Sequence, residues 1–585
     1  MKHPFQRASQ RASQRASQRA SHPPALALTL AFALALALAL ALALTSACGD
    51  MTDSASFSDV GNWQDADTSS PQDSGSTSET GPTAETSAPD TTPPPPPPEA
   101  EVDFDLRTPE AGDTFLYIPS AALDALVVVD ARTLAVHLVE VGVTPTLVRA
   151  LPGDAGAVVL NEGSSDLSIV RPNPAQGGAP PAVPFSVETL DVTPGANRLV
   201  LAPDGSTAFA FFATTSQGAT YGSLQDVTAV RLTPQPEAFN LAVGFRPEAV
   251  LFADSDRLAL IVCEDGLSGL RLADLTGDTF LPPVPTSPNA FEAPLDREIT
   301  PTPAGRFALV RSLNHQAVMW VDLQSGALTQ LPLPDYPSDL DLTADGTTAV
   351  IPLRTAQQVA LVTVPDAFTW TAPAPDPNVP LGEQPVPVNP FVRYATSGAP
   401  FGSTVITSDE RHALLYTTSP GVMAVGMLDI VSGQAVIQPT VKELEAVIAS
   451  PDGKMAALLH RRASGSGDLG QRNAYSLLDL ATGYAKLVVT AQPVTGVTFT
   501  RDGSELFVLL PDPLGAAHEV QRVKTRSFAV IAYIVPDRPV FVGAMPTLDK
   551  VAIALDNPTG WITFIDTKTD ALLQLNSFEL NSFIE

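Results

Sequence analysis

The residue types that do chemistry are few in this 585-residue chain, and their spacing matches none of the common catalytic motifs. No two of the seven histidines show the His-x-x-x-His spacing that brings two imidazoles to one metal ion, and His518-Glu519 lacks the second histidine of a zinc-protease motif. There is no Gly-x-Ser-x-Gly, no glycine-rich phosphate loop and no Cys-x-x-Cys. The sequence therefore identifies no cofactor, and a metal site would have to combine residues from distant segments.

Two further features have structural interpretations. Asp339 and Asp341 alternate with leucines, and this period of two places both carboxylates on one face of a β-strand, which we expect to line a channel. Cys263 ends an apolar run, and we expect it to be a small buried residue and not a reactive thiol.

The composition favours β-strands and excludes some partners. With 44% hydrophobic residues and 56 prolines, the chain has material for a large core but too much proline for long helices. The formal charge is −30, and removing the five basic side chains of the first 47 residues lowers it to −35. So acidic a chain repels nucleic acid and anionic lipid, which excludes nucleic-acid binding as a function.

Residues 1–47 have the organisation of an export signal: a basic region without acids, followed by an apolar Ala/Leu run at 25–44. The stretch Thr45-Ser46-Ala47-Cys48 resembles the end of a bacterial lipoprotein signal, which implies that Cys48 is lipidated and that the protein is anchored in a membrane of the bacterial cell envelope. On that basis we expect it on the outer membrane, facing the periplasm or the cell surface. An uncleaved membrane anchor and a plain secretory signal are the alternatives.

Residues 48–103 are rich in Ser, Thr, Asp and Pro and contain the hexaproline Pro93 to Pro98. Such a segment buries too little apolar surface to fold, so we predict a disordered linker between the anchor and the next domain.

From residue 104 to 585 one unit recurs, marked by a tight turn that is often Asp-Gly. The turns are centred on Asp154, Asp204, Asp254, Ala304, Asp345, Asp409, Asp452, Asp502 and Leu548, at steps of 50, 50, 50, 41, 64, 43, 50 and 46 residues. Asp-Gly favours a hairpin because glycine adopts positive φ freely and the aspartate side chain bonds the turning backbone. The strand after each turn is almost continuously apolar, which indicates burial on both faces.

A second element, such as Leu478-Asp479-Leu480-Ala481-Thr482-Gly483, ends a third strand in several units. Together the two elements resemble the YVTN family of β-propeller repeats and its lactonase-like and WD40-like relatives. The resemblance implies an all-β fold, a single large β-propeller of about 8 to 10 four-stranded blades. Members of the family include adhesive surface proteins, lactonases and cofactor-bearing dehydrogenases, so the fold carries no chemistry by itself. Two smaller propellers divided near Pro373 to Pro400 are the alternative.

In a four-stranded blade the loops between second and third strands share one face with the crossings to the next blade. We assign to this face the insertions Ala213 to Asp226, Arg461 to Asn473, Pro511 to His518, Pro282 to Arg297 and Pro373 to Pro400; the insertion Pro172 to Pro184 lies nearer the opposite face. Long loops on one rim are typical of a binding face. The candidate ligand-binding residues on it are Arg311, His315, Arg354, Arg461, Arg462, Arg472 and His518, with Tyr221, Arg393 and Tyr394 on the longer loops. Basic groups on an acidic protein can receive carboxylates, phosphates or acidic glycans.

Three functions remain open. The first is a non-enzymatic binding or scaffold module for a protein or an envelope glycan. The second is a propeller enzyme of the lactonase or quinoprotein kind, and the third is a structural or adhesive surface protein. A cluster of three or more acids, amides or histidines at the channel mouth would favour the enzyme, and a large apolar patch on the outer edge would favour the structural role.

Overall fold

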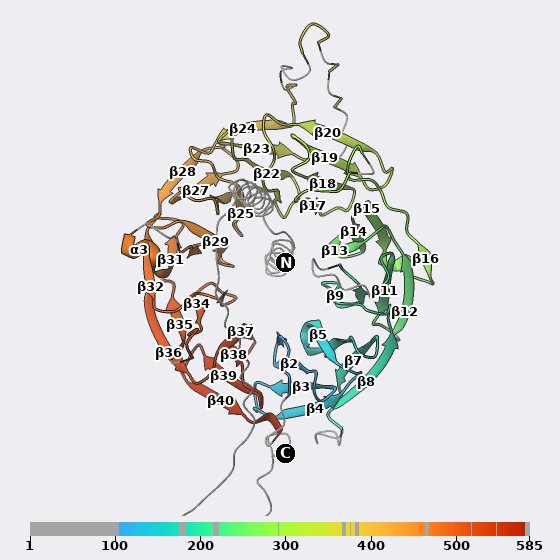
Figure 1. Cartoon of the computed structure of the whole chain (residues 1–585), viewed down its shortest axis with the longest axis vertical. Helices are drawn as coiled ribbons and strands as arrows, with labels where there is room; N and C mark the ends of the chain where they lie inside the picture. The colour runs from blue at the N-terminus through green and yellow to red at the C-terminus, as the bar shows by residue number, and fades with distance from the viewer. Residues whose placement is uncertain are drawn as a thin grey trace, which may run out of the picture. The chain divides into compact units, whose positions relative to one another are not determined.

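The computed structural model describes residues 104–579, apart from 175–182, 215–221, 290–291, 366–369, 372, 375, 381–384, 386, 463–466, 516 and 546. The described chain forms ten consecutive sheets arranged around a ring (Figure 1), which confirms the predicted all-β propeller and sets the number of blades at ten. The predicted signal, the linker and Cys48 lie outside the described residues. Among those that are described, no helix is long and apolar enough to cross a membrane.

Each blade is built from consecutive strands, with the first strand innermost and the last on the outer wall (Figure 1). Blade 1 contains β1 (Glu110–Ala111), β2 (Phe115–Ser120), β3 (Ala125–Asp130) and β4 (Val136–Glu140). Blade 2 contains β5 (Pro145–Ala150), β6 (Ala157–Asn161), β7 (Asp166–Pro172) and β8 (Phe185–Asp191). Blade 3 contains β9 (Arg198–Leu201), β10 (Thr207–Phe211), β11 (Asp226–Arg231) and β12 (Glu237–Ala242). Blade 4 contains β13 (Pro247–Ala253), β14 (Leu258–Cys263) and β15 (Gly266–Arg271). Blade 5 contains β17 (Glu298–Pro301), β18 (Phe307–Arg311), β19 (Ala317–Asp322) and β20 (Leu328–Pro332). Blade 6 contains β21 (Asp341–Leu342), β22 (Thr348–Leu353), β23 (Gln358–Thr363) and β24 (Val392–Thr396). Blades 7 to 10 contain β25 (Ser403–Ile406), β26 (His412–Tyr416), β27 (Ala424–Asp429) and β28 (Ala435–Pro439); β29 (Leu444–Ala449), β30 (Met455–His460), β31 (Asn473–Asp479) and β32 (Ala485–Thr490); β33 (Gly496–Phe499), β34 (Glu505–Leu510), β35 (His518–Lys524) and β36 (Ala529–Val535); β37 (Pro539–Met545), β38 (Lys550–Leu555), β39 (Trp561–Asp566) and β40 (Leu572–Asn576).

All nine predicted turns join a first strand to a second strand, as expected. The apolar second strands are buried on both faces, because each blade packs between two neighbours. Cys263, at the end of β14, has no exposed surface, which confirms the prediction of a buried cysteine, and burial raises the pKa of its thiol to about 12.

The hydrophobic core is divided among the boundaries between blades. One cluster of buried side chains lies at each of the ten boundaries, the first and last blades included. Full burial of a Val, Leu, Ile, Phe or Met side chain stabilises the ring by roughly 1.5–3 kcal/mol. The ring therefore depends on contacts between blades as much as on hydrogen bonds within them.

Packing of the two ends of the described chain closes the ring, without exchange of a strand. Leu116 and Val127 of blade 1 share a cluster with Ile562 and Phe564 of blade 10. The N–H of Phe104 also donates to the carbonyl of Pro558 over 2.9 Å, which joins the two ends directly.

Blades 3 and 4 depart from four strands. β16 (Thr279–Phe280) follows β15 along the chain but pairs in parallel with β12, so blade 3 has five described strands and blade 4 has three. After β16, backbone pairing with β15 in the described chain is reduced to one bridge between Val284 and Leu267, while Oγ of Ser268 donates to the carbonyl of Leu281 over 2.8 Å. Prolines flank Val284 on both sides, and because proline lacks an N–H donor, a longer ladder cannot form here.

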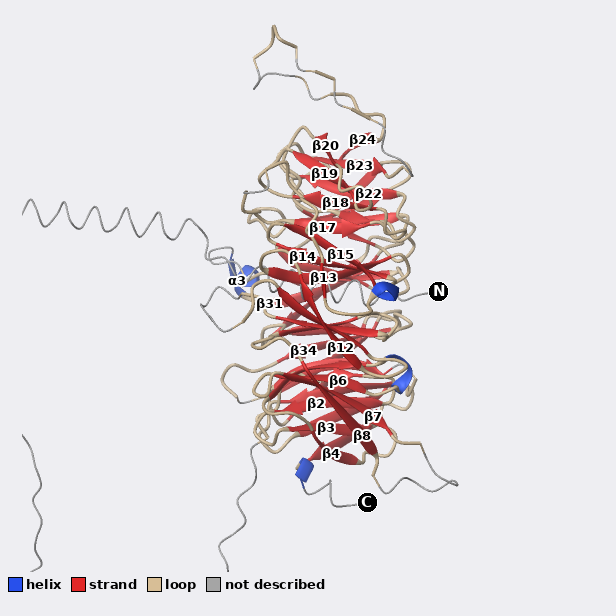
Figure 2. Cartoon of the chain, turned by 90° about the vertical axis from the view of Figure 1, so that its right-hand side faces the viewer, coloured by secondary structure: helices blue, strands red, loops and turns tan. Residues whose placement is uncertain are grey.

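The connections alternate between the two faces of the ring, which Figure 2 shows edge-on. We call the face that carries the second-to-third-strand loops and the crossings between blades the loop face, and the opposite face the turn face. Four of the predicted long insertions lie on the loop face: 213–226, 461–473 and 511–518 between second and third strands, and 282–297 at a crossing. The insertion 172–184 joins β7 to β8 and belongs to the turn face, as predicted.

The prediction for the insertion Pro373 to Pro400 was wrong. Residues 364–391 link the third strand β23 to the fourth strand β24 inside blade 6, so this insertion belongs to the turn face and not to a crossing. The chain resumes the blade only at Val392, where the proline-rich run ends and Val362 becomes its partner. A proline-rich run has few N–H donors for a ladder, so the fourth strand begins after it. The ring also continues past this point, which removes the alternative of two smaller propellers.

Candidate functional site

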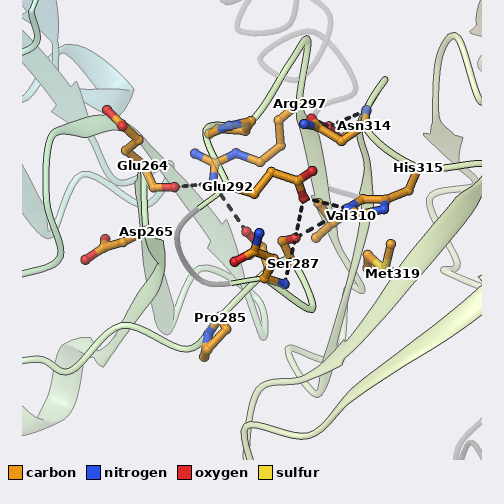
Figure 3. Close-up of a pocket in the computed structure, with 14 residues that line it drawn as sticks. Glu264, Asp265, Pro285, Ser287, Glu292, Arg297, Val310, Asn314, His315 and Met319 are labelled. Atoms are coloured by element: carbon orange, nitrogen blue, oxygen red, sulfur yellow. Dashed lines mark hydrogen bonds and ion pairs between the residues drawn. The ribbon is translucent and has the colours of Figure 1, made fainter.

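Two hollows open on the loop face, and both are lined by the insertions that were predicted to lie there. The first lies between blades 4 and 5, where the crossing 281–297 meets the loops that follow β14 and β18 (Figure 3). The second lies on blade 8, between the loop 461–472 and the end of β32. They differ in size and in how far their polar groups are already used.

The first hollow holds a tight cluster of Ser287, Glu292 and His315, whose side chains point toward one another in Figure 3. Nε2 of His315 lies 2.8 Å from Oε2 of Glu292 and 3.3 Å from Oγ of Ser287, and Ser287 donates to the same carboxylate oxygen over 3.0 Å. The cavity encloses about 20 Å³, which is room for about one water molecule.

These three residue types are those of a hydrolase triad, but their geometry differs. A triad uses one ring nitrogen toward the nucleophile and the other toward the carboxylate. Here Ser287 and Glu292 both face Nε2, and a nitrogen that donates to a carboxylate cannot take the serine proton. The hydrogen bonds from Ser287 and His315 hold the pKa of Glu292 below its ordinary value, so the carboxylate stays charged. The cluster therefore fixes the crossing 281–297 to blade 5.

Arg311 is buried and already engaged. Its guanidinium donates to Oδ2 of Asp296 over 2.9 Å and to Oε2 of Glu298 over 3.0 Å, and its side chain is 8% exposed. Burial opposes its charge, but Glu298 and Asp296 raise its pKa above the ordinary value. Arg311 thus holds the crossing in place, and it does not reach the surface as the sequence interpretation required.

Arg297 likewise holds the crossing to blade 4, and it was not identified as a functional residue from the sequence. Its guanidinium donates to the carbonyl of Cys263 over 2.7 Å and to Oε2 of Glu248 over 3.0 Å. No local pattern identifies it, since these two partners lie 34 and 49 residues away along the chain.

The second hollow is larger and brings two of the predicted residues together. It has a volume of about 450 Å³ and is lined by Arg462, Gln471, Arg472, Asn473, Val489, Thr490 and Ala491. Two guanidinium groups and two side-chain amides on one surface form a set of hydrogen-bond donors that suits carboxylate or phosphate oxygens, whereas the hydroxyl of Thr490 already donates to the carbonyl of Gln492 over 2.7 Å.

The short helix α3 (Gly467–Gln471) positions this set. Nζ of Lys442 donates to the carbonyls of Leu469 and Gly470, both over 2.8 Å, at the C-terminal end of the helix. Nε of Arg462 donates to the carbonyl of Gln471 over 2.8 Å, and Arg472 pairs with Asp468 over 3.0 Å. Burial and the nearby Arg462 both lower the pKa of Lys442, as expected for a cation among cations. The helix is thereby held between three basic side chains.

Arg354 and Arg461 also lie on the loop face. NH1 of Arg354, in the loop after β22, donates to Oγ of Ser419 on blade 7 over 3.2 Å. Arg461 directly precedes Arg462, and its backbone N–H donates to the carbonyl of Glu443 over 3.0 Å. The loop face of blades 6 to 8 therefore carries a row of arginines.

The other predicted residues lie elsewhere. Arg393 and Tyr394 belong to β24 on the outer wall, because the insertion before them is on the turn face. His518 is buried, and its Nδ1 accepts from the N–H of Asp512 over 2.9 Å, which holds the loop 511–517. Tyr221 lies outside the described residues.

The two aspartates that the sequence placed on a first strand are both buried. Asp341 belongs to β21, and Asp339 immediately before it accepts from the N–H of Thr404 over 2.8 Å, which joins blade 6 to blade 7. In the described part of the chain, no group of three His, Cys, Asp or Glu side chains is arranged to hold a metal ion.

Comparison with known proteins adds the following. No family model and no curated protein matches the chain, so the YVTN and lactonase-like assignment stays a prediction while the propeller fold itself is established. Many solved structures show partial likeness, and three of them serve as examples. Hydrazine synthase of Kuenenia stuttgartiensis is 16% identical over 46% of this chain and 76% of its own, with a TM-score of 0.29. Dihydro-heme d1 dehydrogenase NirN is 14% identical over 60% of this chain and 72% of its own, with a TM-score of 0.38. Apo AztD of Citrobacter koseri is 13% identical over 63% of this chain and 91% of its own, with a TM-score of 0.36. Because every one of these TM-scores is below 0.5, what those proteins bind or catalyse does not carry over to this chain.

Proposed function

We propose that this chain is an exported, lipid-anchored β-propeller of the bacterial cell envelope, and that it acts as a non-enzymatic binding module. Its partner, a protein or an envelope glycan, presents acidic groups to the loop face of blade 8. The observation that carries this proposal is the second hollow, where Arg462 and Arg472 lie beside Gln471 and Asn473.

The electrostatics of the whole chain support this location. A protein with a formal charge of −30 repels acidic molecules from most of its surface, so a cluster of cations marks the region where an acidic group is attracted. Arginine suits this task, since its planar guanidinium binds carboxylate or phosphate through two parallel hydrogen bonds. Lys442 and α3 hold both arginines in place before any ligand arrives, which lowers the entropic cost of binding.

Binding of acidic probes to the chain without residues 1–47, with Cys48→Ser, tests the proposal. The probes are polygalacturonate, poly-glutamate and inorganic phosphate, titrated by calorimetry at two salt concentrations. We expect at least one probe to bind, more weakly at higher salt, and Arg462→Gln with Arg472→Gln to reduce its affinity about tenfold or more.

The matched control removes the same charge from the turn face. Arg501 and Arg526 are exposed there, and Arg501→Gln with Arg526→Gln should leave the affinity unchanged. If both double variants reduce binding equally, the attraction is a property of the net charge and the proposed site is refuted. If none of the probes binds the parent chain, acid recognition at this site is refuted as well.

Anchoring rests on the sequence from Thr45 to Cys48 and has its own test. Cells that express the full chain are labelled with a clickable fatty acid and then fractionated. We expect the label and membrane association with Cys48, and loss of both in Cys48→Ser. A Cys48→Ser protein that remains in the membrane would instead point to an uncleaved apolar anchor.

A further inference from the structure

An apolar patch adjoins the basic hollow on the loop face. Met423 follows β26, Val441 lies at the crossing from blade 7 to blade 8, and Leu469 belongs to α3. All three side chains are exposed, at 53%, 58% and 38% respectively, although burial would stabilise such large apolar groups.

Hydrogen bonds show that these three residues are neighbours. The N–H of Thr440, directly before Val441, donates to the carbonyl of Met423 over 2.9 Å. Lys442, directly after Val441, donates through Nζ to the carbonyl of Leu469 over 2.8 Å. These bonds place the three exposed apolar residues on adjoining segments of blades 7 and 8.

Arginines flank the patch on both sides. Arg354 reaches Ser419, in the same loop as Met423, and Arg462 and Arg472 lie on the blade 8 side beside α3. Two carboxylates in this region have partners, since Glu443 accepts from the N–H of Gly421 over 2.8 Å and Asp468 pairs with Arg472, while Glu445 is exposed. The surface thus has an apolar centre and a cationic rim, the arrangement found at the centres of protein interfaces.

The apolar centre distinguishes between the two partner classes. Phosphate and acidic polysaccharide satisfy the arginines but bring little apolar surface to Met423, Val441 and Leu469. A protein segment supplies both, with carboxylates for the rim and aliphatic or aromatic side chains for the centre. The charge of this region, opposite to that of the chain as a whole, makes the segment acidic.

We propose that Met423, Val441 and Leu469, with Arg354, Arg462 and Arg472 around them, form a docking surface for an acidic protein segment that carries apolar side chains. This inference rests on the proposed function and names the partner class for the same site. It assigns the affinity to two separable parts, an electrostatic rim and an apolar centre.

The test is a selection of displayed random 15-residue peptides on the chain without residues 1–47, with Cys48→Ser. We expect the selected peptides to combine Asp or Glu with Leu, Ile, Phe or Met. A synthetic copy of the most frequent peptide is then compared with a copy in which every apolar residue is serine. The serine copy should bind about tenfold more weakly or worse.

The protein is varied in the same way. The triple variant Met423→Ser, Val441→Ser and Leu469→Ser should bind the selected peptide about tenfold more weakly than the parent chain does. Its affinity for the serine copy should be unchanged, since that copy contacts only the arginines. The matched triple variant Val436→Ser, Ile534→Ser and Leu572→Ser alters exposed residues of the outer wall and should change neither affinity. Equal midpoints of thermal unfolding establish that all variants are folded.

Failure of this inference differs from failure of the proposed function. If polygalacturonate or phosphate binds through Arg462 and Arg472 while selection yields peptides without apolar residues, the partner is not an apolar protein segment and the inference is overturned. If the arginine variants change the affinity for none of the probes and none of the peptides, both the proposed function and this inference are refuted.

Discussion

Gly346, in the turn between β21 and β22, packs so closely on Pro303 of the preceding blade that a Cβ atom at Gly346 would lie 2.4 Å from Cδ of the proline ring. The same approach recurs between Gly205 and Pro152, where that distance would be 2.7 Å. Gly346 also has a φ of +75°, a backbone conformation that residues with a side chain rarely adopt. The turn glycine therefore serves both the hairpin within a blade and the contact between blades.

Gly346→Ala should destabilise the protein by at least about 2 kcal/mol, because backbone strain and a clash with a rigid ring act together. Chemical unfolding measures this free energy. Gly153→Ala separates the two causes, because Gly153 has a φ of +67° but no neighbour within 4 Å of the added Cβ, and it should cost about 1 kcal/mol. Equal losses in the two variants would show that the contact between blades contributes nothing.

These turns explain why so much of the fold could be predicted. Asp-Gly, present in four of the nine turns, specifies a hairpin through the conformation of two residues, and the regular spacing of all nine turns locates the first and second strands from blade 2 onward. The place of β24 is different, because its pairing with β23 forms across a proline-rich insertion, and no local pattern distinguishes a fourth strand from a crossing.

The site could be predicted in part for the same reason. Arg462 and Arg472 border one loop, so assigning that loop to a face also brought the two residues together. Arg311 was misjudged because its partners Asp296 and Glu298 come from a crossing whose path depends on packing between blades. Lys442 was missed, since only the folded crossing brings it to the end of α3.

Arg522 yields a second prediction, on a buried ion pair within blade 9. It has no exposed surface and donates to both carboxylate oxygens of Glu505, over 2.8 and 2.5 Å, and it also bonds Asp570 of blade 10. Burial opposes its charge, yet Glu505 raises the pKa of Arg522 above the ordinary value. Glu505→Gln should cost about 3 kcal/mol or more, because it leaves a buried cation poorly paired.

The double variant Glu505→Gln with Arg522→Met should lose less stability than the two single variants added together, since neither charge is left alone. Additive losses in the free energy of unfolding would refute the pairing. Lys568→Gln is a suitable control, because it removes an exposed partner of Asp549 and should cause no measurable change.

His460 gives a prediction in weakly acidic solution. Its Nδ1 lies 3.3 Å from the carbonyl of Glu443 and its Nε2 2.6 Å from Oγ of Ser476, so Nδ1 carries the proton and Nε2 accepts. Burial lowers the pKa of His460 from 6.5 to about 4. The unfolded chain therefore binds more protons than the folded chain between these values, and stability falls as the pH drops from 6.5 to 4.

Comparison of the parent chain with His460→Asn isolates this effect. Between pH 7.5 and 4.5 the parent should lose about 2 to 3 kcal/mol more than the variant, which has nothing to titrate at this position. Parallel losses across this range would mean that His460 is protonated in the folded state.

Asp429 gives the last prediction, at lower pH. Its Oδ1 accepts from the N–H of Ser432 over 2.7 Å, and Arg411 lies 3.2 Å from Oδ2. The bond from Ser432 is the main reason that the pKa of Asp429 falls to about 2, below the 3.8 of a free aspartate. A depressed carboxyl pKa gives stability that is complete above the unfolded value and is lost as the pH falls toward the folded value. Asp429→Asn keeps the acceptor oxygen but removes the charge, so the parent should be the more stable protein at pH 6, and the difference should shrink steadily from pH 4 to pH 2. Urea unfolding across this range measures it, and a difference that persists unchanged at pH 2 would show that the variant disturbs the turn itself and not its charge.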